Sequence, residues 1–231
     1  MRRLLLLLFA VAFLAGSSQE QEKNALVTVR GIIGIPKPIS SRMFNTSFNG
    51  VYEANLSVCV RLFDNFHAGF GYQNSLFQNN EKVFVYYTVP ASQRTGGSTL
   101  SYNTKLMGHA GFIRLGYDRF FSKKGYMSYA LNSGAIKGVF MNVVPDTSSR
   151  NMPLQPDYFI APYLQPEVAA NFIVDPTLSF SIMLSYTTVF AHFDPRSPRF
   201  NHIAEVNTKT NSYPMSWFNI GFGFNVLINR K

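Results

Sequence analysis

The sequence predicts an all-β fold of antiparallel strands, and three observations support this. Apolar and polar residues alternate in several segments of about ten residues, the period of a strand whose two faces meet different environments. Aromatic residues make up 15% of the chain and charged residues only 14%, whereas about a quarter is usual in soluble domains. No segment beyond the N-terminus has the roughly 18 consecutive apolar residues of a membrane-spanning helix. A transmembrane β-barrel combines these properties, because every second residue of its strands faces the lumen.

The first 18 residues have the form of a cleaved secretory signal peptide. Arg2 and Arg3 are followed by an apolar run over 4–14 and by small residues over 15–18. The run is too short to span a membrane, which takes about 20 residues. Residues 19–231 are therefore expected to form an exported barrel domain, and removal of the two arginines lowers the formal net charge from +9 to +7. We expect an exported basic chain to meet envelope anions and not nucleic acid.

Eight segments show the pattern of membrane-crossing strands. They cover residues 25–35, 51–62, 66–75, 105–120, 126–142, a strand ending over 167–174, 177–187 and 218–228. The cleanest alternation is in 177–187, where Leu178, Phe180 and Ile182 alternate with serines. In the fifth segment the phase becomes unclear around Ser133 and Gly134, where we expect a β-bulge.

The connections between these strands alternate in length. Short turns follow the second, fourth and sixth strands, and long loops follow the first, third, fifth and seventh. An even strand number places both termini on one side, the periplasm, with the long loops outside the cell. The long loop after the third strand contains a further strand-like segment, 83–89, so that ten strands are the alternative. Its seven residues fall short of the roughly 9 to 11 that cross a membrane, which favours a hairpin above the membrane.

With this strand period and loop asymmetry, the chain resembles the small eight-stranded outer-membrane barrels of the OmpA/OmpX-type superfamily. The resemblance covers nearly the whole mature sequence and rests on architecture. It implies an eight-stranded antiparallel up-and-down barrel in the outer membrane. The C-terminus departs from the pattern, because two basic residues follow the last strand where such barrels usually end on an aromatic residue. An exported β-sandwich or lipocalin-like barrel is the soluble alternative.

Charged residues on the polar faces of the strands predict a network inside the lumen. An eight-stranded barrel has an interior just wide enough to be filled by side chains. Because an isolated buried charge is costly, we expect opposite charges to pair there and plug the barrel. An ion-selective pore is the alternative. The residues of the predicted network are Arg30, Glu53, Arg61, Arg114, Asp118 and Glu167.

The predicted external loops carry an excess of basic residues. Cations at the outer rim suit the phosphates of lipopolysaccharide, and ordinary solvated loops would show the same excess. The candidate contact residues are Lys37, Arg42, Lys82, Arg94, Lys105, Arg196, Arg199 and Lys209. Four aromatic residues near strand ends, Tyr102, Tyr158, Tyr213 and Trp217, predict an interfacial belt.

Catalysis, metal binding and cofactor binding have little support in the sequence. The chain contains no HExxH, no CxxC and no glycine-rich phosphate loop, and its single cysteine, Cys59, excludes an internal disulfide. Small barrels include lipid A-modifying enzymes, for which His109, Ser101 and Glu81 form the set to test first. We expect no enzyme and no cofactor.

Three functional hypotheses follow from the sequence. The leading one is a structural, adhesion or envelope-interaction protein with a plugged lumen, in contact with outer-membrane lipid and lipopolysaccharide. The second is the barrel subunit of a larger outer-membrane secretion or transport complex, with other outer-membrane proteins as partners. A lipid A-modifying enzyme or a narrow pore comes third.

Overall fold

The computed structural model of the chain describes residues 25–40, 44–45, 48–79, 82–89, 94–101, 105–141, 157–192 and 212–228. The predicted signal peptide, residues 1–18, lies outside these ranges. Among the described residues, no helix is long and apolar enough to cross a membrane.

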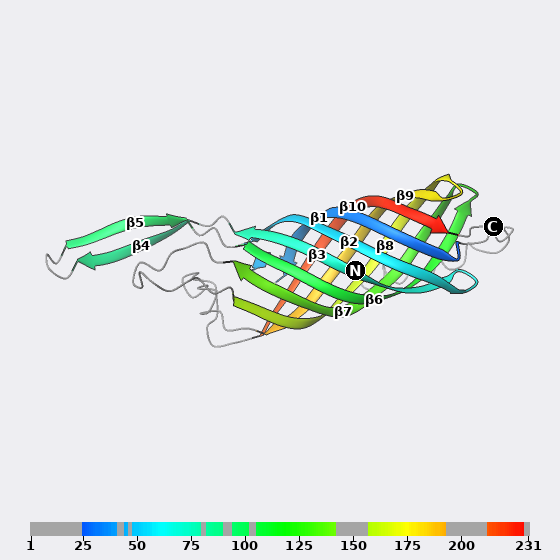
Figure 1. The fold of residues 1–231 in the computed structure, drawn as a ribbon. Helices are drawn as coiled ribbons and strands as arrows, with labels where there is room; N and C mark the ends of the chain where they lie inside the picture. The colour runs from blue at the N-terminus through cyan, green and yellow to red at the C-terminus, as the bar shows by residue number, and fades with distance from the viewer. Residues whose placement is uncertain are drawn as a thin grey trace, which may run out of the picture.

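Eight antiparallel strands close into a barrel, as the alternation predicts. Their order around the barrel is β1-β10-β9-β8-β7-β6-β3-β2, so that the first and last strands close it (Figure 1). The other two strands, β4 and β5, pair only with each other. The eight-stranded prediction is therefore confirmed over the ten-stranded alternative. The strands are β1 (Val27–Ser40), β2 (Phe48–Phe63), β3 (Phe66–Asn79), β4 (Lys82–Val89), β5 (Arg94–Ser101), β6 (Lys105–Ser122), β7 (Gly125–Met141), β8 (Asp157–Asp175), β9 (Leu178–His192) and β10 (Ser212–Ile228).

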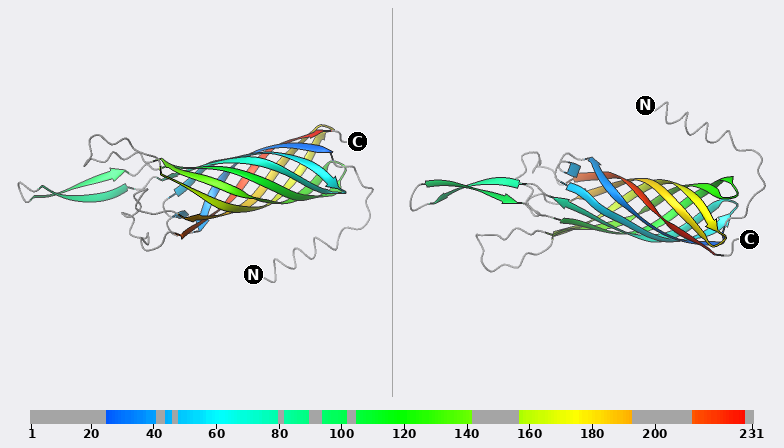
Figure 2. Two further views of the ribbon diagram at one scale, coloured as in Figure 1. Left: turned by 60° about the horizontal axis from the view of Figure 1, so that its bottom comes forward. Right: turned by 90° about the horizontal axis from the view of Figure 1, so that it is seen from above.

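The two ends of the barrel differ. At one end, here called the terminal end, Val27 pairs with Ile228, and two-residue turns at 64–65, 123–124 and 176–177 join neighbouring strands. Asp64 adopts a φ of 40° in the first of these turns, a conformation that Asp tolerates better than most residues. The opposite end is called the loop end. The β4–β5 hairpin projects beyond the loop end in all three views (Figures 1 and 2).

The alternation of side chains produces two different surfaces, most clearly in β10. Phe218, Ile220 and Phe222 point outward and are 44%, 67% and 60% exposed. Asn219 and Asn225 point inward and are buried. Between them, a Cβ added at Gly223 would collide with the backbone oxygen of Gly31 in β1. The sequence thus provides an apolar exterior, a polar interior and small residues where neighbouring strands approach closely.

Several strands are longer than the sequence predicts. β1 continues through Ser40, because from Pro36 onward it pairs with β10 but no longer with β2, and a proline is tolerated where no partner needs its N–H. β10 begins at Ser212, inside the long loop that is predicted to follow the seventh strand. The predicted bulge at Ser133 and Gly134 is also wrong: pairing of β7 with β6 is regular there, and alternation continues to Met141.

An apolar belt surrounds the barrel. The outward residues of β10 from Phe218 to Ile228 span about 23 Å at roughly 3.3 Å per residue and a tilt of about 45°. This matches the apolar band of about 25 Å that outer-membrane barrels present to lipid. Polar outward residues mark its margin toward the loop end. The outward residues between this margin and the terminal end are apolar or aromatic apart from Ser133 and Arg119. These marker residues are Lys37, Tyr52, Asn74, His109, Lys137 and Thr188.

Candidate functional site

The middle of the lumen holds a charge triad of Arg30, Arg114 and Glu167. Arg114 donates two hydrogen bonds to Glu167, from Nη1 to Oε2 at 2.7 Å and from Nη2 to Oε1 at 3.1 Å. Arg30 Nη1 lies 2.6 Å from Glu167 Oε1. All three side chains are at least nine-tenths buried. The structure therefore brings one carboxylate between two guanidinium groups from β1 and β6.

Glu53 lies apart from this triad, toward the loop end. Trp217 Nε1 donates to its Oε2 at 2.6 Å, while Gln165 Nε2 and Asn219 Nδ2 each donate to its Oε1 at 2.9 Å. Asn55 adds a fourth donor at 3.2 Å. No cation of the described residues forms an ion pair with Glu53, so its predicted pairing with an opposite charge is wrong. Its neighbours at this level are amide and aromatic side chains, and an ionised carboxylate can accept all four hydrogen bonds.

Aromatic side chains fill the loop end of the lumen. Phe77 contacts both Phe44 and Trp217, with ring centroids 4.9 Å and 5.1 Å away, and Phe44 and Trp217 also contact each other at 6.0 Å. Trp217 is only 2% exposed and Tyr213 is 6% exposed, so both point into the barrel. Their predicted place in an interfacial belt is wrong, whereas Tyr158 points outward and Tyr102 lies outside the described residues. The aromatic cluster and the layer around Glu53 together seal this half of the lumen.

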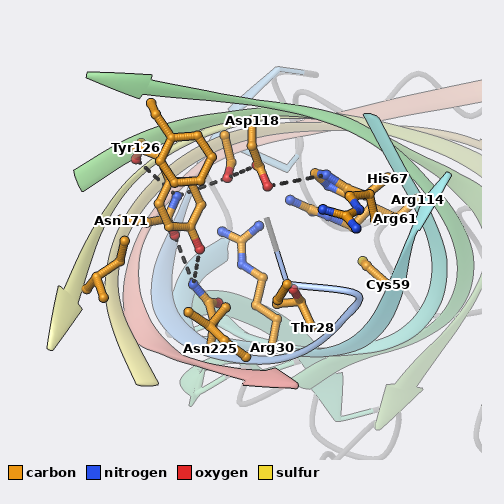
Figure 3. Close-up of a pocket in the computed structure, with 15 residues that line it drawn as sticks. Thr28, Arg30, Cys59, Arg61, His67, Arg114, Asp118, Tyr126, Asn171 and Asn225 are labelled. Carbon is orange, nitrogen blue, oxygen red and sulfur yellow. Dashed lines mark hydrogen bonds and ion pairs between the residues drawn. The ribbon is translucent and has the colours of Figure 1, made fainter. Parts of the chain in front are cut away.

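A cavity of about 40 Å³ lies at the terminal end of the lumen. Three cations, Arg30, Arg61 and Arg114, contribute to its wall, together with Asp118 and His67 (Figure 3). Asp118 accepts a hydrogen bond from the Ser128 hydroxyl at 2.5 Å and lies 3.6 Å from His67 Nδ1. Arg61 and Asp118 thus line the cavity and belong neither to the triad nor to the layer around Glu53.

An amide network closes one side of this cavity. Asn225 Nδ2 donates to Asn171 Oδ1 at 2.9 Å and to Ser181 Oγ at 2.7 Å, and Asn171 Nδ2 donates to Ser128 Oγ at 2.9 Å. These polar side chains come from β7, β8, β9 and β10, and all are buried. The alternation of the strands predicts that these asparagines point inward, but it does not predict their partners. Their cross-lumen contacts require the stagger of the closed barrel.

The histidine of the predicted catalytic set faces the outside of the barrel. His109 Nδ1 lies 2.5 Å from the Tyr72 hydroxyl and 3.1 Å from Asn74 Nδ2. Ser101 is placed only as the last residue of β5, and Glu81 lies outside the described residues. Within the described ranges, no three His, Cys, Asp or Glu side chains gather where they could hold a metal ion.

The predicted lipopolysaccharide contacts are spread over several elements. Lys37 lies within β1 and Lys105 begins β6, so the assignment of these two residues to loops is wrong. Lys82 and Arg94 begin the two strands of the hairpin. The remaining four, Arg42, Arg196, Arg199 and Lys209, lie outside the described residues.

Sequence reasoning missed one cation at the margin of the belt. Lys137 is exposed on β7, and its Nζ lies 5.1 Å from the centroid of the outward Tyr158 ring. This arrangement gives a cation–π contact. The regular alternation of β7 predicts that Lys137 points outward. The bulge expected at Ser133 and Gly134 interrupts this pattern and obscured the prediction.

Comparisons with known proteins concern the fold. No protein-family model matches the sequence, and no curated protein sequence matches it. The solved structure of Neisserial surface protein A (NspA) is similar at a TM-score of 0.52 and 11% identity, covering 90% of this chain and 100% of that one. Two others are the outer membrane protein OprG from Pseudomonas aeruginosa (TM-score 0.43, 11% identity, 90% and 98% covered) and Ail, the attachment invasion locus protein of Yersinia pestis (0.39, 8%, 88% and 99%). The similarity to NspA shows that the chain has the fold of the small eight-stranded outer-membrane barrels.

Proposed function

We propose that the protein is a non-conducting barrel of the outer membrane that acts as a structural, adhesion or envelope-interaction protein. The observation that carries this proposal is the combination of an apolar exterior with a lumen filled by side chains. Large residues such as Phe70 and Ile220 are 69% and 67% exposed on the outside, while Gln165 and Trp217 are almost fully buried inside. Exposed apolar surface of this extent favours lipid over water.

The filled lumen supports a role other than transport. In its middle the triad of Arg30, Arg114 and Glu167 is held by ion pairs, and toward the loop end the aromatic cluster lies across the same path. A hydrated ion would have to break these contacts to pass. In this proposal the barrel anchors the segments at the loop end, among them the β4–β5 hairpin, at the cell surface.

The margin of the apolar belt supports lipopolysaccharide as the envelope partner. Lys37, Lys137 and His109 lie outward where the belt ends toward the loop end. In the proposed topology this margin faces the outer leaflet, whose lipopolysaccharide carries phosphate groups that attract cations.

The proposal places both termini in the periplasm and assigns no catalysis. Lipid A mass profiles that differ with and without the protein would contradict the non-enzymatic part.

Protease treatment of intact cells tests surface display. Trypsin should cleave after Lys82 or Arg94 in the hairpin and leave the exposed turn residues Lys123 and Lys124 at the terminal end uncut. Permeabilised cells serve as the control in which both ends are accessible. Cleavage at Lys123 or Lys124 in intact cells would contradict the proposed location. Recovery of the protein in the soluble periplasmic fraction would contradict it as well.

Reconstitution with lipopolysaccharide tests the partner. We expect added lipopolysaccharide to raise the unfolding midpoint of the wild type and of Lys123→Gln, and to raise that of Lys137→Gln less, because the latter variant lacks a cation at the belt margin. An equal rise in all three proteins would refute the contact. Purification in mild detergent addresses the second hypothesis, since a subunit of a larger complex would carry stoichiometric partner proteins.

A further inference from the structure

The cavity at the terminal end contains buried arginine nitrogens that the protein itself does not satisfy. Arg30 is 6% exposed, and its Nη1 contacts Glu167. Its Nε and Nη2 find no hydrogen-bond acceptor among the described residues, and neither does Arg114 Nε. Buried polar groups without partners are uncommon, because each costs the free energy of its lost hydration. The guanidinium of Arg30 lies amid the side chains that line the cavity (Figure 3).

The charges around the cavity favour an anion. Arg30, Arg61 and Arg114 face it, against the carboxylates of Asp118 in the wall and Glu167 behind it. The lining thus contains three arginines and a single carboxylate, that of Asp118. Glu167 is engaged by the two arginines of the triad, and Asp118 accepts a hydrogen bond from Ser128. Neither carboxylate accepts a hydrogen bond from Arg30 Nε or Nη2.

The size of the cavity limits what it can hold. Its volume of about 40 Å³ exceeds the roughly 10 to 15 Å³ that one water molecule needs. The space therefore suits a group of a few heavy atoms. Guanidinium groups recognise phosphate oxygens through paired N–H donors in a planar fork, and the interaction is strong where water is excluded.

We propose that the terminal-end cavity is a binding site for a phosphate group, held by Arg30 from the buried side and by Arg61 near the mouth. The side chains of Ala25, Phe120, Ile173 and Leu227 also line the cavity and shield the bound group. Free inorganic phosphate and the esterified phosphate of a lipid headgroup or metabolite share this chemistry. The site is independent of the proposed surface role and of contacts at the loop end.

Calorimetric titration of the folded protein in a phosphate-free maltoside detergent tests the proposal. The ligands are inorganic phosphate and glycerol phosphate, each at constant ionic strength set with chloride. The variants are Arg30→Gln, which leaves both Arg114 bonds to Glu167 in place, and Arg61→Gln near the mouth of the cavity. Lys123→Gln is the matched control, because it removes one positive charge from an exposed turn at the same end.

We expect one phosphate per wild-type chain, unchanged binding by Lys123→Gln, and at least tenfold weaker binding by Arg30→Gln and Arg61→Gln. Binding of both ligands would assign the cavity to esterified phosphate, and binding of inorganic phosphate alone would assign it to the free ion; either supports the site. Absence of binding to the wild type would overturn the proposal, as would equal weakening by Lys123→Gln. If Arg30→Gln does not fold, Arg61→Gln against Lys123→Gln decides the outcome.

Discussion

Replacing Glu167 by glutamine should destabilise the barrel more than any other single change to the triad. The carboxylate is the common partner of Arg30 and Arg114, with three contacts between 2.6 and 3.1 Å. Breaking a buried ion pair by removal of one partner costs about 3 to 5 kcal/mol. Because Glu167→Gln leaves two buried guanidinium groups without an anion, we expect a loss of about 5 kcal/mol in the free energy of unfolding.

The other members of the triad provide a ranking that depends on the geometry. Arg30→Gln removes a single charge-assisted contact and leaves Glu167 paired with Arg114, so we expect a cost of about 1.5 to 3 kcal/mol. Arg114→Ala removes two contacts and leaves a void, so its cost should lie between those of the other two variants. Leu115→Ile is the control, because Leu115 neighbours Arg114 on the outward face, where it is 57% exposed. We expect it to cost less than about 1.5 kcal/mol.

Urea unfolding in detergent measures this ranking. Trp217 is the only tryptophan of the chain and is buried in the lumen, so that its fluorescence reports the opening of the barrel. The midpoints and slopes of the four variants are compared with the wild type under the same conditions. Equal free energies of unfolding for Glu167→Gln and Leu115→Ile would refute the reasoning, because a lumen filled with water would hydrate the unpaired arginines.

Three further predictions concern the packing and the location of the barrel. Trp217→Phe removes the N–H donor to Glu53 at 2.6 Å and should lower the free energy of unfolding by about 1.5 to 3 kcal/mol, measured by circular dichroism; no change would mean that water replaces the indole. Gly138→Ala places a methyl group against the Phe159 ring and should cost about 1 to 3 kcal/mol, whereas the outward Gly111→Ala meets no atom within 4 Å and should be nearly neutral; equal effects would contradict the packing. The mature chain should fractionate with the outer membrane and change its gel mobility on boiling, and recovery in the soluble periplasm would contradict the fold assignment.

The features that the sequence predicts well are those governed by local period. Alternation in the strands depends only on which residues face outward. The number of barrel strands follows from it, and so does the inward direction of Arg114 in β6 and Glu167 in β8. The length of 83–89 likewise predicts a hairpin outside the barrel. Both are properties of single strands, and neither requires knowledge of how strands are staggered.

The features that sequence reasoning missed depend on stagger and on strand ends. Glu53 and Arg61 share one face of β2 but lie at different positions along the barrel axis. Glu53 therefore contacts Trp217, while Arg61 lines the terminal-end cavity. Extending the alternation of β10 backward from Asn219 predicts an inward Trp217, but the proline at 214 and the polar residues before it concealed the start of the strand. Partners across a lumen are fixed by the closed register, which one sequence does not contain.

Conductance in a planar lipid bilayer tests the central claim, a membrane barrel whose lumen is filled, most directly. Wild-type protein inserted from detergent should produce no stable current steps, because the triad and the aromatic cluster occupy the path through the barrel. Insertion of the same protein preparation is verified in lipid vesicles, where the barrel should be protected from protease. Well-defined, ion-selective current steps from the inserted wild type would show that the barrel is an open pore, which contradicts a filled lumen.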